Sequence, residues 1–183
     1  IFLIFTQIFL MHYLFLPLLL LTFNCFSQSS HPNIIFILAD DLGYGDVHCL
    51  NPNGKIPTPN IDRIASSGIL FTDAHSTSSV CTPTRYSILT GRYAWRTRLK
   101  SNVLIPYDPP LIETGRTTIA SMLRQSGYTT AMFGKWHLGF NWVTNDGDKA
   151  IDKQGVNNIL YSEQLKGGPL DHGFDYFFGM DAP

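Results

Sequence analysis

Charged residues are missing from the first part of the chain, because no Asp, Glu, Lys or Arg precedes Asp40. Residues 1–23 are almost wholly apolar, and from Met11 onward an apolar run leads into small residues. That pattern is typical of a secretory signal peptide, with Cys25 and Ser27 at the small positions ahead of the cleavage point. We therefore expect a signal peptide at residues 1–27, preceded by a possible upstream read-through at residues 1–10, and an exported protein.

The alternative to cleavage is a membrane anchor, because the apolar run from Ile1 is long enough to span a bilayer. The region around His12 also lacks the Lys or Arg that usually opens a signal peptide. We favour cleavage and export, either periplasmic or extracellular, and we expect no stable membrane partner.

Clusters of basic residues are also missing. The chain of 183 residues carries 13 Lys and Arg against 14 Asp and Glu, for a net charge of −1, and its basic residues form no long run. Nucleic acid is therefore excluded as an expected partner, since phosphate contacts need clustered Lys and Arg. Hydrophobic residues make up 44% of the sequence, which is enough for one packed core.

Cysteines are few, and a disulfide framework is excluded because only Cys49 and Cys81 remain beyond the expected signal peptide. A single disulfide between them is possible in an oxidising compartment. His48, Cys49 and His75 lack the spacing of a zinc site.

Strands are expected to alternate with helices. Residues 33–39 form a continuous apolar run of the kind that is buried on both faces of a parallel sheet. A helix should follow the loop at residues 43–57, with Thr58 and Pro59 at its start and Gly68 at its end. A short strand is expected at residues 69–71.

Two more helices and a strand are expected further along the chain. One helix should run over residues 82–90 to Gly91. Another should start at the cap Thr117-Thr118, carry Ile119, Met122 and Leu123, and stop at Gly127. Residues 128–133 read as a strand that ends before Gly134. Together these elements predict an α/β layered domain at residues 28–183.

Three local patterns carry candidate chemistry. In the first, Cys81-Thr-Pro-Thr-Arg85 is followed by Leu-Thr-Gly-Arg92. Pro83 suits the first turn of a helix, so Cys81 should lie at a helix N-terminus, which favours anions. Arg85 lies four residues on, on the same face, where it can contact residue 81 and a bound anion. Taken alone, a buried structural Cys beside a surface Arg is the alternative.

The second pattern is Asp40-Asp41-Leu-Gly-Tyr-Gly-Asp46, at the carboxyl end of the first expected strand. Ligands bind at the carboxyl ends of strands in open α/β sheets. Adjacent carboxylates favour a hard cation, Ca²⁺ or Mg²⁺. A solvated acidic turn is the alternative, and we interpret Asp46 as a structural cap of the loop.

The third pattern is Gly134-Lys-Trp-His-Leu-Gly139, just beyond another expected strand. In an extended segment Lys135 and His137 would point to the same side. Taken alone, either residue would usually be an exposed side chain without a functional role.

The three patterns, in this order, resemble the motifs of the formylglycine-dependent sulfatase family, which belongs to the alkaline phosphatase superfamily. The resemblance extends over residues 33–179 and includes the first helix and the segment Asp171-His-Gly-Phe-Asp175, which we assign to packing. It implies a central, mostly parallel sheet flanked by helices. Family members are longer, so we expect this chain to be the N-terminal part of the catalytic domain and to be inactive alone.

The resemblance also implies roles. A formylglycine-generating enzyme would oxidise Cys81 to an aldehyde, whose hydrate attacks the sulfur of a sulfate ester. Asp40, Asp41 and residue 81 would hold the Ca²⁺ or Mg²⁺ ion. Arg85 would support residue 81, and Lys135 and His137 would bind the sulfate. The substrate would be a small aryl sulfate or a sulfated carbohydrate.

Other functions remain open at this point. A phosphodiester or phosphonate monoester hydrolase of the same superfamily can use the same residue, although the Lys135 motif favours sulfate. A thiol nucleophile at Cys81 with His137 as its base is conceivable. A non-catalytic secreted binding module is a further alternative. The aromatic segment at residues 93–98 either lines the pocket or packs in the core.

Overall fold

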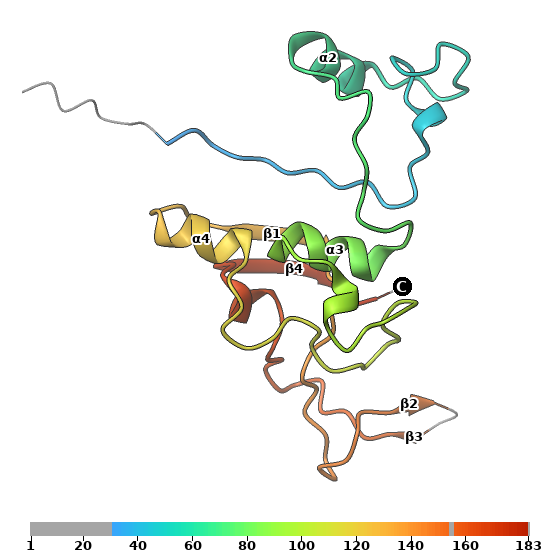
Figure 1. Ribbon diagram of the computed structural model, residues 1–183. Helices are drawn as coiled ribbons and strands as arrows, with labels where there is room; N and C mark the ends of the chain where they lie inside the picture. The colour runs from blue at the N-terminus through green and yellow to red at the C-terminus, as the bar shows by residue number, and fades with distance from the viewer. Residues whose placement is uncertain (1–30, 154–155, 183) are drawn as a thin grey trace, which may run out of the picture. The chain divides into compact units, whose positions relative to one another are not determined.

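The computed structural model describes residues 31–153 and 156–182 (Figure 1). Residues 31–39 belong to one unit, and the unit from Asp40 onward contains every helix and strand that is described below. The helices are α2 (Pro59–Ser67), α3 (Cys81–Thr90) and α4 (Ile119–Gln125), and the strands are β1 (Ala131–Lys135), β2 (Asp152–Lys153), β3 (Val156–Asn157) and β4 (Tyr176–Met180). Short 3-10 helices lie at Tyr44–Asp46, Ala94–Arg96 and Pro169–His172.

The three helices confirm the elements that the sequence predicts, because each carries its own start and stop signals. Pro59 opens α2, and Gly68 follows its last residue. Gly91 ends α3 in a left-handed conformation, with φ 64° and its N–H bonded to the carbonyl of Ser87. At the start of α4, Thr118 Oγ1 accepts a hydrogen bond of 3.0 Å from the N–H of Ser121.

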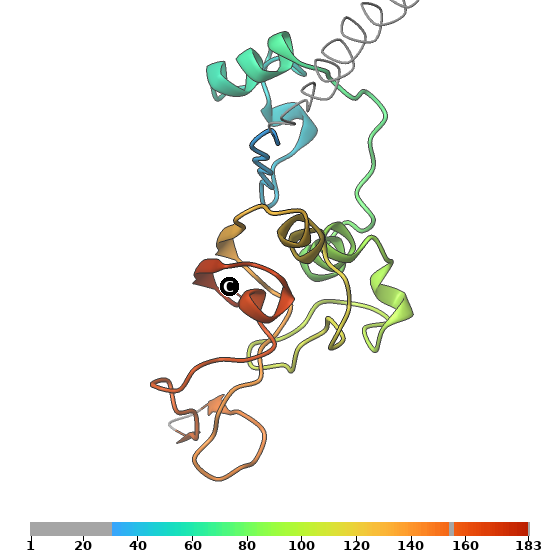
Figure 2. The ribbon, with the colours of Figure 1, turned by 90° about the vertical axis from the view of Figure 1, so that its left-hand side faces the viewer.

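Strands β1 and β4 form a parallel pair, in register from Ala131 opposite Tyr176 to Lys135 opposite Met180. The expected strand at residues 128–133 therefore begins three residues later and includes Lys135. Its limits are set by β4, which lies far away in sequence, so no local pattern could define them. Helices α3 and α4 lie together on one side of this pair (Figures 1 and 2).

Two expected strands are wrong. Residues 33–39 and 69–71 join no ladder among the described residues. Their apolar side chains are exposed, with Ile35 at 84% and Ile69 at 80%. A strand is defined by its hydrogen-bonded partner, so an apolar run without one remains irregular.

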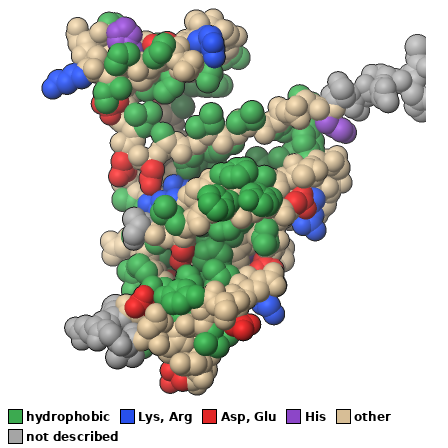
Figure 3. All heavy atoms as spheres, turned by 180° about the vertical axis from the view of Figure 1, so that it is seen from behind, with side chains coloured by type: hydrophobic (Ala, Val, Ile, Leu, Met, Phe, Trp, Pro, Cys, Tyr) green, Lys and Arg blue, Asp and Glu red, His purple; other side chains and the backbone are tan. Residues whose placement is uncertain are grey.

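The core lies between α3, β1 and the segment that follows β1. Its centre is formed by Tyr86, Trp136 and Leu138, each fully buried. The opposite face of the β1–β4 pair carries exposed rings, among them Phe133 and Phe178, and apolar side chains gather in the view from behind (Figure 3). The segment at Pro169–His172 packs as the sequence predicts, since His172 is buried and Phe174 contacts the core.

None of the described helices is both long and apolar enough to cross a membrane. The expected signal peptide at residues 1–27 lies outside the described residues, so cleavage and export stay predictions.

Candidate functional site

Helix α3 begins at Cys81, so this residue lies at a helix N-terminus as the sequence predicts. Val80 precedes the helix in an extended conformation, with φ −131° and ψ 160°. The thiol of Cys81 is half-buried, is not in a disulfide, and has no hydrogen-bond partner among the described residues. The first amide groups of a helix point away from it and favour negative charge, which suits an anion beside residue 81.

Charged side chains from three distant segments meet beside this helix. Lys135 Nζ lies 3.0 Å from Asp40 Oδ2, and Arg85 Nη2 lies 3.8 Å from the same oxygen. Arg85 Nη1 also donates a hydrogen bond to the carbonyl of Lys135. The side chains of Arg85 and Lys135 are only 11% and 15% exposed. Two largely buried cations thus lie beside one carboxylate, which is itself 46% exposed.

This arrangement affects the ionisation of Asp40. The hydrogen bond from Lys135 lowers the pKa of Asp40 below its ordinary value, and the nearby charge of Arg85 acts in the same direction. Asp40 is therefore ionised at neutral pH. Arg85 Nε, by contrast, is buried and has no partner among the described residues. An unsatisfied buried donor is uncommon in native proteins, so it marks a position that suits an additional acceptor.

His137 is buried just beyond β1. Its Nε2 lies 2.9 Å from the carbonyl oxygen of Leu104, so Nε2 carries the proton and Nδ1 is the free acceptor. Nδ1 is buried and has no partner in the described part of the chain. Burial lowers the pKa of His137, and the positive charges of Lys135 and Arg85 lower it further. The imidazole is therefore neutral at pH 7.

The sequence predicts that Lys135 and His137 lie in one extended segment with their side chains on the same side. This expectation is wrong, because the backbone leaves the extended conformation at His137. His137 has φ 54°, in the left-handed region, and the side chain of Trp136 before it is fully buried. The turn is held by the N–H groups of Trp136 and His137, which donate to the carbonyls of Met180, the last residue of β4, and of Asp181 just after it. His137 nevertheless remains within electrostatic range of Lys135 and Asp40. The thiol–histidine pair that the sequence left open forms no hydrogen bond.

The acidic loop after residue 39 has a distinct geometry. Asp46 Oδ2 accepts a hydrogen bond of 2.9 Å from the N–H of Gly43, which confirms Asp46 as a loop cap. Asp41 adopts φ 58°, an unusual conformation for a residue other than glycine. Backbone strain of this kind clusters at functional sites.

The two adjacent carboxylates are the type of ligand that a hard cation prefers, but they are too few to complete its coordination. Asp40 and Asp41 offer carboxylate oxygens, whereas Ca²⁺ takes six to eight oxygen ligands. No cluster of three or more His, Cys, Asp or Glu side chains occurs within residues 31–153 and 156–182. One oxygen of Asp40 is also bound by Lys135. Asp40 and Asp41 alone would therefore provide only part of a ligand set for such an ion.

Sequence patterns missed Asp181, which lies beside this site. Burial raises the pKa of Asp181 to about 6, and the charge of Asp108 adds to the rise, while the N–H of Gly139 opposes it. Its Oδ1 is buried without a partner in the described chain. No composition or spacing marked Asp181, because its burial results from the pairing of β4 with β1.

Replacing Asp181 by asparagine should stabilise the chain at pH 8 by about 1–3 kcal/mol. The unfolded carboxyl has a pKa near 3.8 and the folded one near 6, so the folded state loses stability as the pH rises through this window. The gain should be much smaller at pH 4, where the folded carboxyl is neutral and the unfolded one is only partly ionised. Urea unfolding at pH 4, 6 and 8 measures it, and the exposed Asp73→Asn is the matched control. An equal gain at pH 4 and pH 8 would contradict the burial argument.

Known proteins share this chain's sequence over most of its length. The model of the sulfatase family matches residues 32–183. The chain is 47% identical over 156 residues to the N-acetylgalactosamine-6-O-sulfatase of Bacteroides thetaiotaomicron, covering 85% of this chain and 27% of that protein. It is 38% identical over 173 residues to human steryl-sulfatase, covering 90% of this chain and 27% of that protein. The chain thus spans about a quarter of the length of these curated relatives.

Solved structures agree. A Bacteroides thetaiotaomicron protein described as BT33336S-sulf, from a locus for glycosaminoglycan metabolism, matches with a TM-score of 0.69 and 38% identity, over 84% of this chain and 29% of that one. The protein Ps i-CgsB matches with a TM-score of 0.63 and 32% identity, over 83% and 28%. The fold class that was expected from the sequence is therefore confirmed, with the α/β architecture of the alkaline phosphatase superfamily present in part. The chain belongs to the sulfatase family.

Proposed function

We propose that this chain provides the nucleophile and the sulfate-binding groups of an enzyme that hydrolyses sulfate esters. One observation carries the proposal. Beside the helix that begins at Cys81, two buried polar atoms lack partners in the described chain, the donor Arg85 Nε and the acceptor His137 Nδ1. An oxyanion and a hydroxyl group would satisfy both atoms.

The substrate class follows from the charges and from the relatives. Lys135 and Arg85 place two cations beside one carboxylate, which favours a tetrahedral anion over a neutral ester. The relatives are named as arylsulfatases, as a steryl-sulfatase and as an N-acetylgalactosamine-6-O-sulfatase. We infer that the substrate is an aryl or carbohydrate sulfate.

In the proposed reaction, a formylglycine-generating enzyme oxidises Cys81 to an aldehyde, which takes up water to give a geminal diol. One hydroxyl of the diol attacks sulfur, and the substrate alcohol leaves with a proton. Lys135 and Arg85 stabilise negative charge on the sulfate oxygens. His137 Nδ1 accepts a hydrogen bond from a diol hydroxyl, which orients it.

The second half of the reaction needs the second hydroxyl. When that hydroxyl loses its proton, its oxygen forms the carbonyl and the bond between carbon and the sulfate oxygen breaks. Sulfate is released and the aldehyde is restored. A serine or cysteine ester has no second hydroxyl on the same carbon, so it would remain sulfated.

Asp40 and Asp41 are the residues that would hold a divalent cation, which we infer to be Ca²⁺ or Mg²⁺. When bound, such an ion lowers the pKa of a coordinated hydroxyl group. Residue 81 would complete the part of the ligand set that this chain provides. We further propose that residues 1–27 direct the protein to export.

The test uses protein expressed from the complete gene together with a formylglycine-generating enzyme. Mass spectrometry of the peptide that spans residue 81 should show an aldehyde in place of the thiol. The same preparation should release 4-nitrophenol from 4-nitrophenyl sulfate and should lose this activity with a chelator. Hydrolysis of a phosphonate monoester in preference to the sulfate ester, or no hydrolysis despite complete modification, would refute the proposal.

A further inference from the structure

Residues 74–107 contain no Asp or Glu but carry five basic side chains. Arg85 and Arg92 are paired with carboxylates from other segments, Asp40 and Glu113. The remaining three, Arg96, Arg98 and Lys100, have no carboxylate within ion-pair distance among the described residues. This part of the molecule therefore presents unneutralised positive charge, although the whole chain has a net charge of −1.

Two aromatic side chains lie in the same segment and face solvent. Tyr93 is 49% exposed and Trp95 is 55% exposed, while Ala94 between them is buried. Their rings are nearly parallel, with centroids 5.7 Å apart and an angle of 19° between the planes. Packing in the core, one of the two roles that the sequence left open, is therefore wrong for both residues.

The neighbouring cations are held in place by Trp95. The guanidinium carbon of Arg96 lies 5.1 Å from the centre of the Trp95 ring, and Lys100 Nζ donates to the Trp95 carbonyl at 3.0 Å. Arg96 uses none of its side-chain donors on another described residue, and Lys100 uses one of three. The free donors are thus fixed beside an aromatic surface. We call Tyr93, Trp95, Arg96 and Lys100 the aromatic platform.

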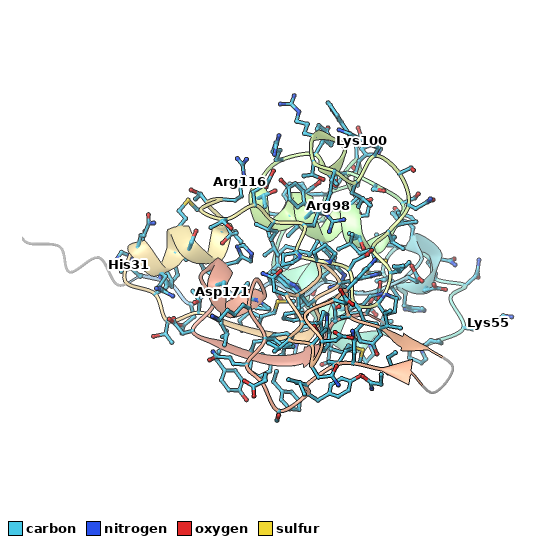
Figure 4. All side chains as sticks on the ribbon, turned by 90° about the horizontal axis from the view of Figure 1, so that it is seen from below. His31, Lys55, Arg98, Lys100, Arg116 and Asp171 are labelled. Carbon is cyan, nitrogen blue, oxygen red and sulfur yellow. The ribbon has the colours of Figure 1, made fainter. Side chains whose placement is uncertain are left out.

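A cavity of about 150 Å³ adjoins the platform. Tyr93, Trp95 and Lys100 form part of its lining, and the polar residues Ser78 and Asn102 form another part. Figure 4 shows Lys100 on the outside of the molecule, on the same side as Arg98. A sulfated sugar presents hydroxyl groups, an apolar ring face and sulfate groups. Polar residues, an aromatic ring and cations, in that order, are the side chains that bind these three features.

The cavity touches the face of α3 that points away from the charged cluster. Its wall includes Pro83 and Ser87, which lie on the side of α3 opposite to Cys81 and Arg85, since successive residues of a helix are rotated by about 100°. A ligand that reaches both sides must pass around the start of a helix that is about 10 Å wide. One sugar ring is too short for this path.

We propose that the aromatic platform is a subsite for a second sulfated sugar, so that the substrate is a sulfated oligosaccharide or polysaccharide rather than a small aryl sulfate. This inference rests on the proposed function for the reaction itself. The platform stands on its own contacts, so its binding can be measured whether or not the reaction occurs.

The experiment measures two quantities on protein expressed from the complete gene. Calorimetric titration with a sulfated dextran oligosaccharide measures binding, and 4-nitrophenyl sulfate measures the reaction. We expect Trp95→Ala and the double variant Arg96→Gln/Lys100→Gln each to weaken binding about tenfold or more. Turnover of 4-nitrophenyl sulfate should stay within about twofold of the unchanged protein.

Matched controls are Arg63→Gln and Lys55→Gln, which remove exposed cations outside the platform and should leave binding unchanged. Unsulfated dextran should bind more weakly than the sulfated form by about tenfold or more. Should Trp95→Ala fail to fold, the double variant carries the test, because its side chains are exposed.

Unchanged binding in the platform variants would overturn the subsite. Equal binding of single-stranded DNA of matched charge would overturn it too, since the surface would then be a general polyanion site. Absence of 4-nitrophenyl sulfate turnover together with platform-dependent glycan binding would remove the proposed reaction and leave the subsite. The two failures are thus distinguishable.

Discussion

Replacing Cys81 by alanine will lower kcat for 4-nitrophenyl sulfate by at least about a thousandfold, because the variant has no group that can become the nucleophile. Helix α3 should survive the change, since alanine is the best helix former and the Cys81 thiol bonds to no other described residue. The measurement is initial rates at saturating substrate, on protein whose circular dichroism matches that of the unchanged enzyme.

Two further variants test whether the loss of activity in Cys81→Ala is due to the missing nucleophile. Cys81→Ser should accept one sulfo group and then stop, because a serine ester has no second hydroxyl on its carbon, and mass spectrometry should detect the trapped adduct. Cys49→Ser is the matched control, since Cys49 is an exposed free cysteine that is not part of the charged cluster. Near-normal turnover by Cys81→Ala would exclude residue 81 as the nucleophile. Continuous turnover by Cys81→Ser would refute the need for a diol.

The helices were predictable because the residues that start and stop each helix lie within a few positions of its ends. Pro59 and Gly68 enclose α2, and Gly91 ends α3 with the positive φ that glycine adopts easily. Thr118 caps α4 through a neighbour only three residues away. Each signal acts within one turn, so a short window of sequence contains it.

The strands were less predictable because their limits depend on distant partners. Strand β1 begins at Ala131 rather than residue 128, since Tyr176 is the first residue of β4 opposite it. Thr130, just before β1, is instead bound to Asp175, with its N–H 2.9 Å from Asp175 Oδ2. Ile35 and Ile69 are as apolar as any strand residue, yet neither belongs to a ladder in the described structure.

The sequence predicted which charged residues belong to the candidate site, but it did not predict how they are arranged. The patterns named Asp40, Arg85 and Lys135, and the structure brings these three together. They did not show that His137 turns into a left-handed conformation or that its Nδ1 is left free. Such features follow from backbone bonds to the segment after β4, which no spacing rule within one motif contains.

Removing the side chain of Lys135 will lower kcat by about 100- to 1,000-fold, the usual effect of losing one preorganised donor to a developing oxyanion. In Lys135→Ala the ammonium group that neutralises Asp40 at 3.0 Å is also lost, and only Arg85 at 3.8 Å remains beside that carboxylate. The pKa of Asp40 should therefore rise toward its ordinary value. Because that ordinary value is 3.8, rates measured below about pH 5 should show the acid limb moved to higher pH.

Chemical rescue separates a direct role from a structural one. The cavity that Lys135→Ala leaves should admit methylammonium, which restores a cation near the sulfate and should raise the rate of this variant in a saturable way. Lys55→Ala, which removes an exposed lysine outside the site, should neither lose activity nor respond. A Lys135→Ala enzyme with normal kcat would show that Arg85 alone suffices for the anion. Loss without rescue, and with an unchanged pH profile, would instead assign Lys135 to packing, because the carbonyl of Lys135 already binds Arg85 through the backbone.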